Sequence, residues 1–299
     1  NDQSFVTLNK FNTYFFIKKK DLKKLPKFNN KIKVEDTDHK NFNGEEVVKL
    51  SFVNRTDLVE TYKSINKKIE TYEADLKPQY KFLMDNDILE GIEIEGDYVS
   101  GERVDRIYRE PEIKPAKFKP KLKILSIDTE SDKKGELYCI GMYSENYKKE
   151  FMITAHKLPN VVNCKDQEDC LEKFKQELIK FDPDILTGWN VIDFDFVYLK
   201  ELYKKNKIKF DIGRNNDEPR ARIEKNFFRS SSVDLPGRQV LDGLNLIKDP
   251  FIKEAPSIKK ANFDSLTLED VSRAIINEGK TIKGKHRNKE IESLYNTNT

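Results

Sequence analysis

The chain has 299 residues, of which 36% are charged, and its 55 basic and 52 acidic residues give a net charge of +3. This length allows two domains that each bury a core. Three cysteines are too few for a disulfide-stabilised secreted module. No apolar run approaches the roughly 18–20 residues that cross a bilayer, and the first 30 residues lack a signal-peptide pattern. We expect a cytoplasmic protein with reduced thiols and no membrane contact.

The first hundred residues predict a small α+β domain. Apolar and polar residues alternate in "SFVTLNKFNTYFFIKKK" (4–20) and "EEVVKLSFVNR" (45–55), as in half-buried strands. The stretch 56–70 has apolar residues at helical spacing, with Thr56 as the expected N-cap. Strand-like alternation interrupted by glycines returns in "EGIEIEGDYVSGERV" (90–104).

A proline-rich stretch then predicts a domain boundary. Residues 109–121, "REPEIKPAKFKPK", contain Pro111, Pro115 and Pro120 and follow neither a helical nor a strand period. We place the boundary near residue 118, which gives domains 1–118 and 119–299.

The second domain is predicted to be α/β with a mixed sheet and flanking helices. Its first three strands are separated by turns short enough for antiparallel hairpins. Helices and further strands follow, with Asp166 as one helix cap and Thr267 with Asp270 in capping-box spacing at another. The expected strands are 122–128, 137–143, 149–154, 184–188 and 238–243, and the expected helices are 166–181, 193–206 and 267–277.

Two carboxylates end the most apolar of these strands. Asp128 and Glu130 are two residues apart, so they project from the same face if the strand continues through them. Two close anions raise each other's pKa unless they share a cation, and Mg²⁺ prefers such oxygen ligands. The spacing alone is weak, because it recurs elsewhere in this acidic chain. The position is more informative, because ligands bind at strand ends in open α/β sheets.

A second polar group follows the strand 184–188, in "LTGWNVIDFDFVYLK" (186–200). A helical crossover makes this strand parallel to the first, so its end should lie at the same sheet edge. Asn190 is expected in the turn and Asp195 in the first helical turn facing the crevice, while Asp193 is expected to cap the helix and Trp189 to belong to the core. Three acidic groups at one edge suit two-metal phosphodiester cleavage.

Lysines cluster in 17–33, 113–123 and 281–289. Such clusters can attract a polyanion, and they are equally typical of an ordinary solvated surface. Composition therefore permits a nucleic-acid partner without requiring one.

Several motifs in order carry a family resemblance. "SIDTE" (126–130), "GELYCIG" (135–141), the stretch 182–199, "GRQVLDG" (237–243) and the stretch 262–280 resemble the proofreading exonuclease domain of family B DNA polymerases, above all bacterial ones. Residues 71–85 and the "IEGDY" after them resemble the N-terminal domain of the same enzymes. The resemblance covers nearly the whole chain.

The resemblance implies a ribonuclease-H-like fold that hydrolyses DNA from its 3′ end. Asp128, Glu130 and Asp195 match the catalytic carboxylates that hold two Mg²⁺ or Mn²⁺ ions, and Asn190 and Phe194 match residues that hold the terminal nucleotides. Thr129 stands where an apolar residue is usual.

The resemblance implies that the chain binds the 3′ end of single-stranded DNA. For the parent polymerase it implies a primer-template and a sliding clamp, the clamp bound through a missing C-terminal part. A monomer is expected.

The family's third motif, Tyr-x-x-x-Asp, is matched only by Tyr295, with Thr299 at the Asp position. We expect the chain to be an excised piece that ends before this motif, unable to polymerise and weak as a nuclease. Two alternatives stay open: a non-catalytic single-stranded DNA-binding platform, and another ribonuclease-H-like nuclease.

Overall fold

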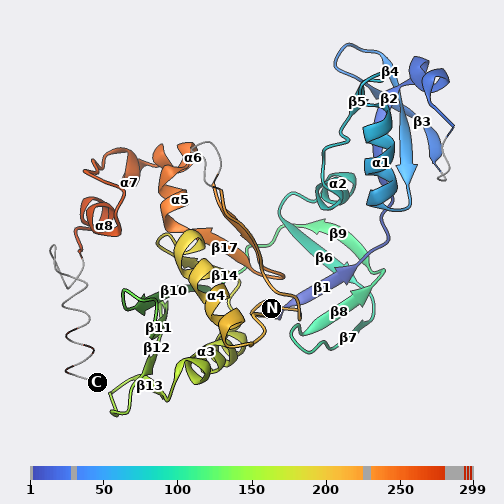
Figure 1. Cartoon of the computed structure of the whole chain (residues 1–299). Helices are drawn as coiled ribbons and strands as arrows, with labels where there is room; N and C mark the ends of the chain where they lie inside the picture. The colour runs from blue at the N-terminus through green and yellow to red at the C-terminus, as the bar shows by residue number, and fades with distance from the viewer. Residues whose placement is uncertain are drawn as a thin grey trace. The chain divides into compact units, whose positions relative to one another are not determined.

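The computed structural model describes residues 3–27, 32–224 and 230–279, together with Ser293, Tyr295 and Thr297. The chain forms two compact units, Asn1–Pro120 and Lys121–Thr299 (Figure 1). Within the described ranges, no helix combines the length and the apolar character needed to span a bilayer.

The first unit contains an antiparallel four-stranded sheet in the order β3-β4-β2-β5, with helix α1 packed against it. Phe15 and Ile17 on β2 and Leu50 on β4 are fully buried in its core. The expected cap Thr56 is wrong: α1 begins earlier, because the side chain of Asn54 accepts the N–H of Asp57. The elements are β2 (Thr13–Lys18), the 3₁₀ helix η1 (Lys19–Lys24), β3 (Lys33–Lys40), β4 (Glu46–Phe52), α1 (Arg55–Ile65) and β5 (Thr71–Tyr72).

Two smaller sheets complete this unit, one in the order β1-β8-β7 and one that pairs β6 with β9. They comprise β1 (Phe5–Leu8), β6 (Gly91–Glu95), β7 (Tyr98–Val99), β8 (Arg106–Arg109) and β9 (Glu112–Ala116), and helix α2 (Pro78–Asp85) precedes β6.

Lysines at the start of the first cluster are engaged in ion pairs. Lys18 and Lys20 both pair with Glu45, and Lys19 pairs with Asp36. This part of the cluster is therefore largely neutralised by acidic neighbours rather than forming an unpaired basic patch.

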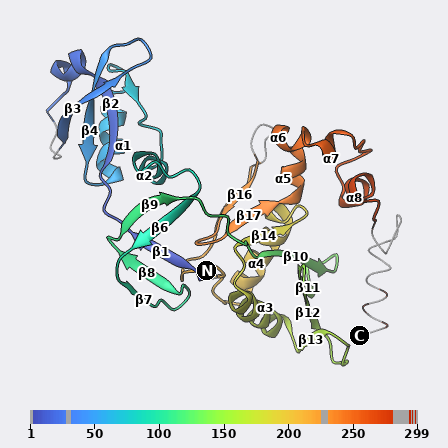
Figure 2. The ribbon, with the colours of Figure 1, turned by 180° about the vertical axis from the view of Figure 1, so that it is seen from behind.

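The second unit is built on a six-stranded mixed sheet in the order β13-β12-β11-β10-β14-β17 (Figures 1 and 2). The predicted antiparallel pairing of the first three strands is confirmed, as is the parallel pairing of the fourth predicted strand with the first. The strands are β10 (Ile124–Ser131), β11 (Leu137–Ser144), β12 (Tyr147–Ile153), β13 (Val161–Cys164), β14 (Ile185–Gly188) and β17 (Gln239–Asp242).

Helices α3 (Gln167–Phe181) and α4 (Val197–Lys205) lie side by side over one face of this sheet (Figure 2). Along β10, Leu125 and Ile127 point into the resulting core and are at most 1% exposed. Helix α3 starts at the predicted cap, since the side chain of Asp166 accepts the N–H of Asp169. Alternation along β10 therefore buries one face of the strand and leaves its opposite face for the polar residues.

Shorter elements follow β14 and β17. A small hairpin pairs β15 (Arg220–Arg222) with β16 (Ser232–Asp234). After β17 come α5 (Gly243–Lys248), α6 (Pro250–Lys253), α7 (Pro256–Lys259) and α8 (Leu268–Ile276). The predicted cap of α8 is confirmed, because Thr267 accepts the N–H of Asp270. Strand β13 was not expected from the sequence.

Candidate active site

Strand β10 carries the first two candidate carboxylates side by side. The prediction that the strand ends at Asp128 is wrong, since β10 continues to Ser131 and pairs with β11 through Glu130. Asp128 lies opposite Gly141 and Glu130 opposite Cys139 in the antiparallel register. Because residues i and i+2 share a face, both carboxylates project from the face of β10 that is turned away from the core.

Asp195 reaches β10 at the residue between these two carboxylates. Strand β14 pairs with β10 only as far as Ser126, so the edge of β10 beyond this point has no β14 partner. There the N–H of Thr129 donates to Oδ1 of Asp195 at 2.9 Å, and the Thr129 hydroxyl donates to the same oxygen at 2.7 Å. Asp195 is only 1% exposed.

A turn of unusual geometry places Asp195 next to Thr129. Residue Asn190 adopts a left-handed conformation with φ of 60°, and a single π-helical turn, η2 (Ile192–Phe196), precedes α4. Single π-helical turns recur at functional sites because they re-aim side chains. Here the turn buries Asp195 and leaves Phe194, which is 52% exposed, facing outward with its ring stacked near Tyr198.

Asp242 at the end of β17 anchors this turn. Its carboxylate accepts the backbone N–H of Asn190 at 3.2 Å and of Ile192 at 3.0 Å. It also caps α5 by accepting the N–H groups of Leu244 and Asn245. The prediction that Asp193 caps the helix is therefore wrong: Asp193 is exposed, and neither η2 nor α4 has a side-chain cap.

Burial, together with the negative charge of this region, shifts the pKa values of two of its side chains. Burial, reinforced by the charge of Asp128, raises the pKa of the Asp195 carboxyl to about 7, although the hydrogen bonds from Thr129 oppose the shift. Burial also raises the pKa of the Cys139 thiol to about 12, with further contributions from the charges of Glu130, Glu150 and Asp128. A bound cation would reduce the cost of keeping these carboxylates ionised.

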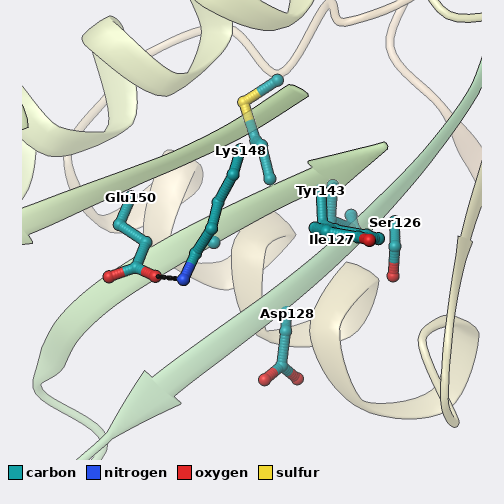
Figure 3. A pocket seen from close by; sticks show the side chains of 8 residues that line it. Ser126, Ile127, Asp128, Tyr143, Lys148 and Glu150 are labelled. Carbon is teal, nitrogen blue, oxygen red and sulfur yellow. Dashed lines mark ion pairs between the residues drawn. The ribbon is translucent and has the colours of Figure 1, made fainter. Parts of the chain in front are cut away.

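A shallow hollow lies beside Asp128 on the same face of the sheet (Figure 3). Gly141 has no side chain and forms part of its lining, and Tyr143 stands at one side of it. Lys148 and Glu150, both on β12, form an ion pair of 3.0 Å at another side of the hollow (Figure 3).

The candidate carboxylates are near one another but do not form a ready ligand cluster. Over residues 3–27, 32–224 and 230–279, no three His, Cys, Asp or Glu side chains are arranged to hold a metal ion. Asp195 instead directs one carboxylate oxygen to Thr129. The structure thus brings the three residues to one segment of β10 with oxygen donors of the right chemistry, and ion binding would require the side chains to turn toward a shared ion.

Tyr295, the one residue that matches the third motif, lies against β11 and β12. Its ring stacks on Tyr138 with centroids 4.0 Å apart, and its hydroxyl donates to the carbonyl of Ile153. Thr299 lies outside the described residues.

The sequence reasoning missed two residues that position this site, Thr129 and Asp242. The aspartate had a usable signal, because an Asp between an apolar strand and a helical stretch is a typical N-cap. The Thr129 hydroxyl had none, since its partner is 66 residues away in the sequence.

The raised pKa of Asp195 predicts a pH-dependent stability difference. Its folded pKa of about 7 lies above its ordinary value of 3.8, so the folded chain binds a proton that the unfolded chain releases. The contribution of this group to stability is therefore present below about pH 4 and is lost as the pH rises to about 7. In Asp195→Asn this loss disappears, so the stability of the variant relative to wild type should rise between pH 4 and 7, by a few kcal/mol in order of magnitude.

Urea denaturation of the wild type and of Asp195→Asn, in EDTA at pH 5 and pH 8, measures the difference in their free energies of unfolding at each pH. Asp193→Asn, at the exposed neighbouring acid, is the control and should follow the wild-type profile. Parallel profiles for wild type and Asp195→Asn would contradict the prediction.

Comparison with known proteins identifies the family. Residues 69–259 match the family model described as DNA polymerase family B, exonuclease domain. The chain is 31% identical to DNA polymerase II of Escherichia coli (strain K12) over 72% of this chain and 26% of that protein. It is 26% identical to a DNA polymerase of Archaeoglobus fulgidus over 67% of this chain and 25% of that protein. The chain thus spans about a quarter of the length of these relatives.

The fold agrees with this match. The structure of the family B DNA polymerase from Pyrobaculum calidifontis superposes with a TM-score of 0.70 at 17% identity, over 98% of this chain and 38% of that one. The family match extends over well more than half of the residues. The chain therefore belongs to the exonuclease domain family of the family B DNA polymerases.

Proposed function

We propose that this chain is the exonuclease part of a DNA polymerase and hydrolyses the phosphodiester bond at the 3′ end of single-stranded DNA. The observation that carries the proposal is the arrangement on β10: Asp128 and Glu130 share one face, and Asp195 is fixed to the residue between them. This places three carboxylates around one short segment of a rigid strand.

The residues fit a hard divalent cation. All three candidate ligands are carboxylates, which Mg²⁺ and Mn²⁺ prefer. The burial that raises the pKa of Asp195 makes its ionised form costly without a nearby cation. Asp128, Glu130 and Asp195 would hold two ions. When bound, these ions would lower the pKa of a water molecule and neutralise charge on the leaving oxygen.

The remaining residues would hold and orient the DNA end. Phe194 exposes an aromatic ring next to Asp195, and such rings stack on unpaired bases. Asn190 lies in the turn that Asp242 anchors, with a side-chain amide able to donate and accept hydrogen bonds. We assign both to binding of the terminal nucleotides.

The relatives are named DNA polymerases, and this chain covers about a quarter of their length. We infer that the whole protein synthesises DNA on a primer-template and uses this domain to remove mispaired ends. A sliding clamp and a monomeric state belong to the same proposal.

A nuclease assay tests the proposed function directly. The chain is incubated with 5′-labelled single-stranded DNA that carries either a free 3′ hydroxyl or a 3′ phosphate, and with circular single-stranded DNA, in Mg²⁺, Mn²⁺ or EDTA. In agreement with the weak nuclease expected from the sequence, we expect the free-ended strand to shorten slowly, by single nucleotides, with a metal ion. The blocked strand should resist, and the circle should stay intact.

Other outcomes identify the alternatives. Cleavage of the circle would indicate an endonuclease of the same fold. DNA binding without hydrolysis, unchanged in Asp128→Ala and weakened by salt, would indicate a binding platform instead.

A further inference from the structure

We propose that the side-chain hydroxyl of Thr129 is a positioning group for Asp195, and that it prepares this carboxylate to bind a divalent cation. The inference deepens the function proposed above and rests on it. The sequence resemblance assigns no role to this position, where an apolar residue is usual.

The local structure makes Thr129 a double donor to one oxygen. Its backbone N–H and its hydroxyl lie 2.9 Å and 2.7 Å from Oδ1 of Asp195. Any residue except proline supplies the N–H, whereas the short hydroxyl side chain of threonine or serine adds a second donor close to the backbone. Two donors that converge on one oxygen restrict rotation of the carboxylate plane while engaging only one of its two oxygens.

The hydroxyl itself is held rigidly. Thr129 is 5% exposed and points to the same buried face of β10 as Leu125 and Ile127. A β-branched side chain has restricted χ1 rotation, and burial in a packed core restricts it further. The donor that orients Asp195 is therefore fixed by the sheet and not by a mobile loop.

Asp195 has a specific need for such a restraint. It lies in the π-helical turn η2, which continues into α4 without a side-chain cap. Its burial penalises the ionised form, which hydrogen bonds from Thr129 favour. Groups that orient a metal-binding side chain typically change metal affinity or activity by roughly 10–100-fold when they are removed.

The test compares Mn²⁺ binding in three threonine variants. Thr129→Val keeps the shape and the backbone N–H but removes the hydroxyl, and Thr129→Ser keeps the hydroxyl. Thr187→Val is the matched control, because the Thr187 hydroxyl donates at 2.7 Å to the main-chain carbonyl of Leu241 within the same sheet and not to a candidate metal ligand. Binding is measured without DNA by the loss of the free Mn²⁺ electron paramagnetic resonance signal, and melting temperatures are measured in EDTA.

We expect Thr129→Val to bind Mn²⁺ about 10-fold more weakly than wild type, and to need a correspondingly higher Mn²⁺ concentration for half-maximal hydrolysis. Thr129→Ser should restore most of this affinity, and Thr187→Val should match wild type. A merely structural role would lower the melting temperature of Thr129→Val without a selective loss of Mn²⁺ affinity.

The possible failures are distinguishable. If wild type binds Mn²⁺ and Thr129→Val binds it equally well, or if Thr187→Val weakens binding as much, the positioning role is overturned while the proposed function stands. If wild type itself binds no Mn²⁺ and hydrolyses no DNA, the proposed function fails and this inference fails with it.

Discussion

Asp128→Asn and Glu130→Gln are each expected to lower the rate of 3′-end hydrolysis by at least about a thousandfold while the chain stays folded. Outer residues that only orient a ligand cost roughly 10–100-fold when removed, so a direct ligand should cost more. Both substitutions keep the size of the side chain and remove one anionic oxygen, which Mg²⁺ and Mn²⁺ require.

The stability expectation follows from where these side chains lie. Asp128 is exposed and Glu130 is half-buried on the outer face of β10. Replacing one of two neighbouring like charges removes a repulsion, so the melting temperature in EDTA should not fall. Glu145→Gln, an exposed carboxylate in the turn between β11 and β12, is the control and should keep wild-type activity.

Rates from 5′-labelled single-stranded DNA, measured beside melting curves, decide the result. Activity within tenfold of wild type in both variants would show that these carboxylates do not hold the catalytic ions. A large activity loss accompanied by unfolding would also contradict the prediction, because it would assign the carboxylates a structural role.

Much of the second unit could be predicted because its signals are local. Short, mostly apolar segments predicted β10 and its two hairpin partners, and short turns between them implied antiparallel pairing. The helical spacing of 166–181 and the handedness of crossover connections together predicted that β14 lies parallel to β10. These features depend on neighbouring residues in the sequence.

The candidate site was only partly predictable because it depends on contacts between distant segments. Alternation predicted that Asp128 and Glu130 share a face, and the register with β11 bears this out. Periodicity could not distinguish an α-helical from a π-helical start at 192–196, so the burial of Asp195 against Thr129 was not foreseen. The separation of β14 from β10 beyond Ser126, which opens room for this contact, has no local sequence signal.

The error at Asp193 has the same origin. A residue just before a predicted helix is a good cap candidate from sequence alone. In the folded chain the N–H groups at this turn are accepted by Asp242, about 50 residues later, which leaves no role for Asp193 as a cap. The hydrogen-bond acceptor at this turn is therefore Asp242, from a distant segment, and not the neighbouring Asp193.

Asp242→Ala is expected to destabilise the chain strongly and to disable the site from a distance. The carboxylate is 3% exposed and accepts four backbone N–H groups, from Asn190, Ile192, Leu244 and Asn245. Leaving buried donors without an acceptor and losing a helix cap should together cost about 3 kcal/mol. For a folding unit of this size, that corresponds to a fall in melting temperature of roughly 6–12 °C.

Asp242→Asn distinguishes the two roles of this side chain, which are to cap α5 and to anchor the turn that carries Asp195. The N–H groups of Asn190, Leu244 and Asn245 converge on Oδ1, whereas that of Ile192 donates to Oδ2. An asparagine can keep its carbonyl oxygen at the Oδ1 position, but its NH₂ group would then face the N–H of Ile192, donor against donor. We expect this variant to retain most of the α5 cap and to disturb the turn that carries Asp195.

The two variants should therefore differ in kind. Asp242→Ala should lose both stability and activity, and Asp242→Asn should lose a larger share of activity than of stability, measured by thermal melting and by 3′-end hydrolysis. The control is Asp249→Ala, an exposed cap that accepts the N–H groups of Phe251 and Ile252, which should cost about 1 kcal/mol and leave hydrolysis unchanged. The contrary outcome is that Asp242→Asn loses stability and activity in the same proportion as Asp242→Ala. The hydrogen bond from the N–H of Ile192 would then make no separate contribution to activity, and Asp242 would affect the site only through the overall stability of the fold.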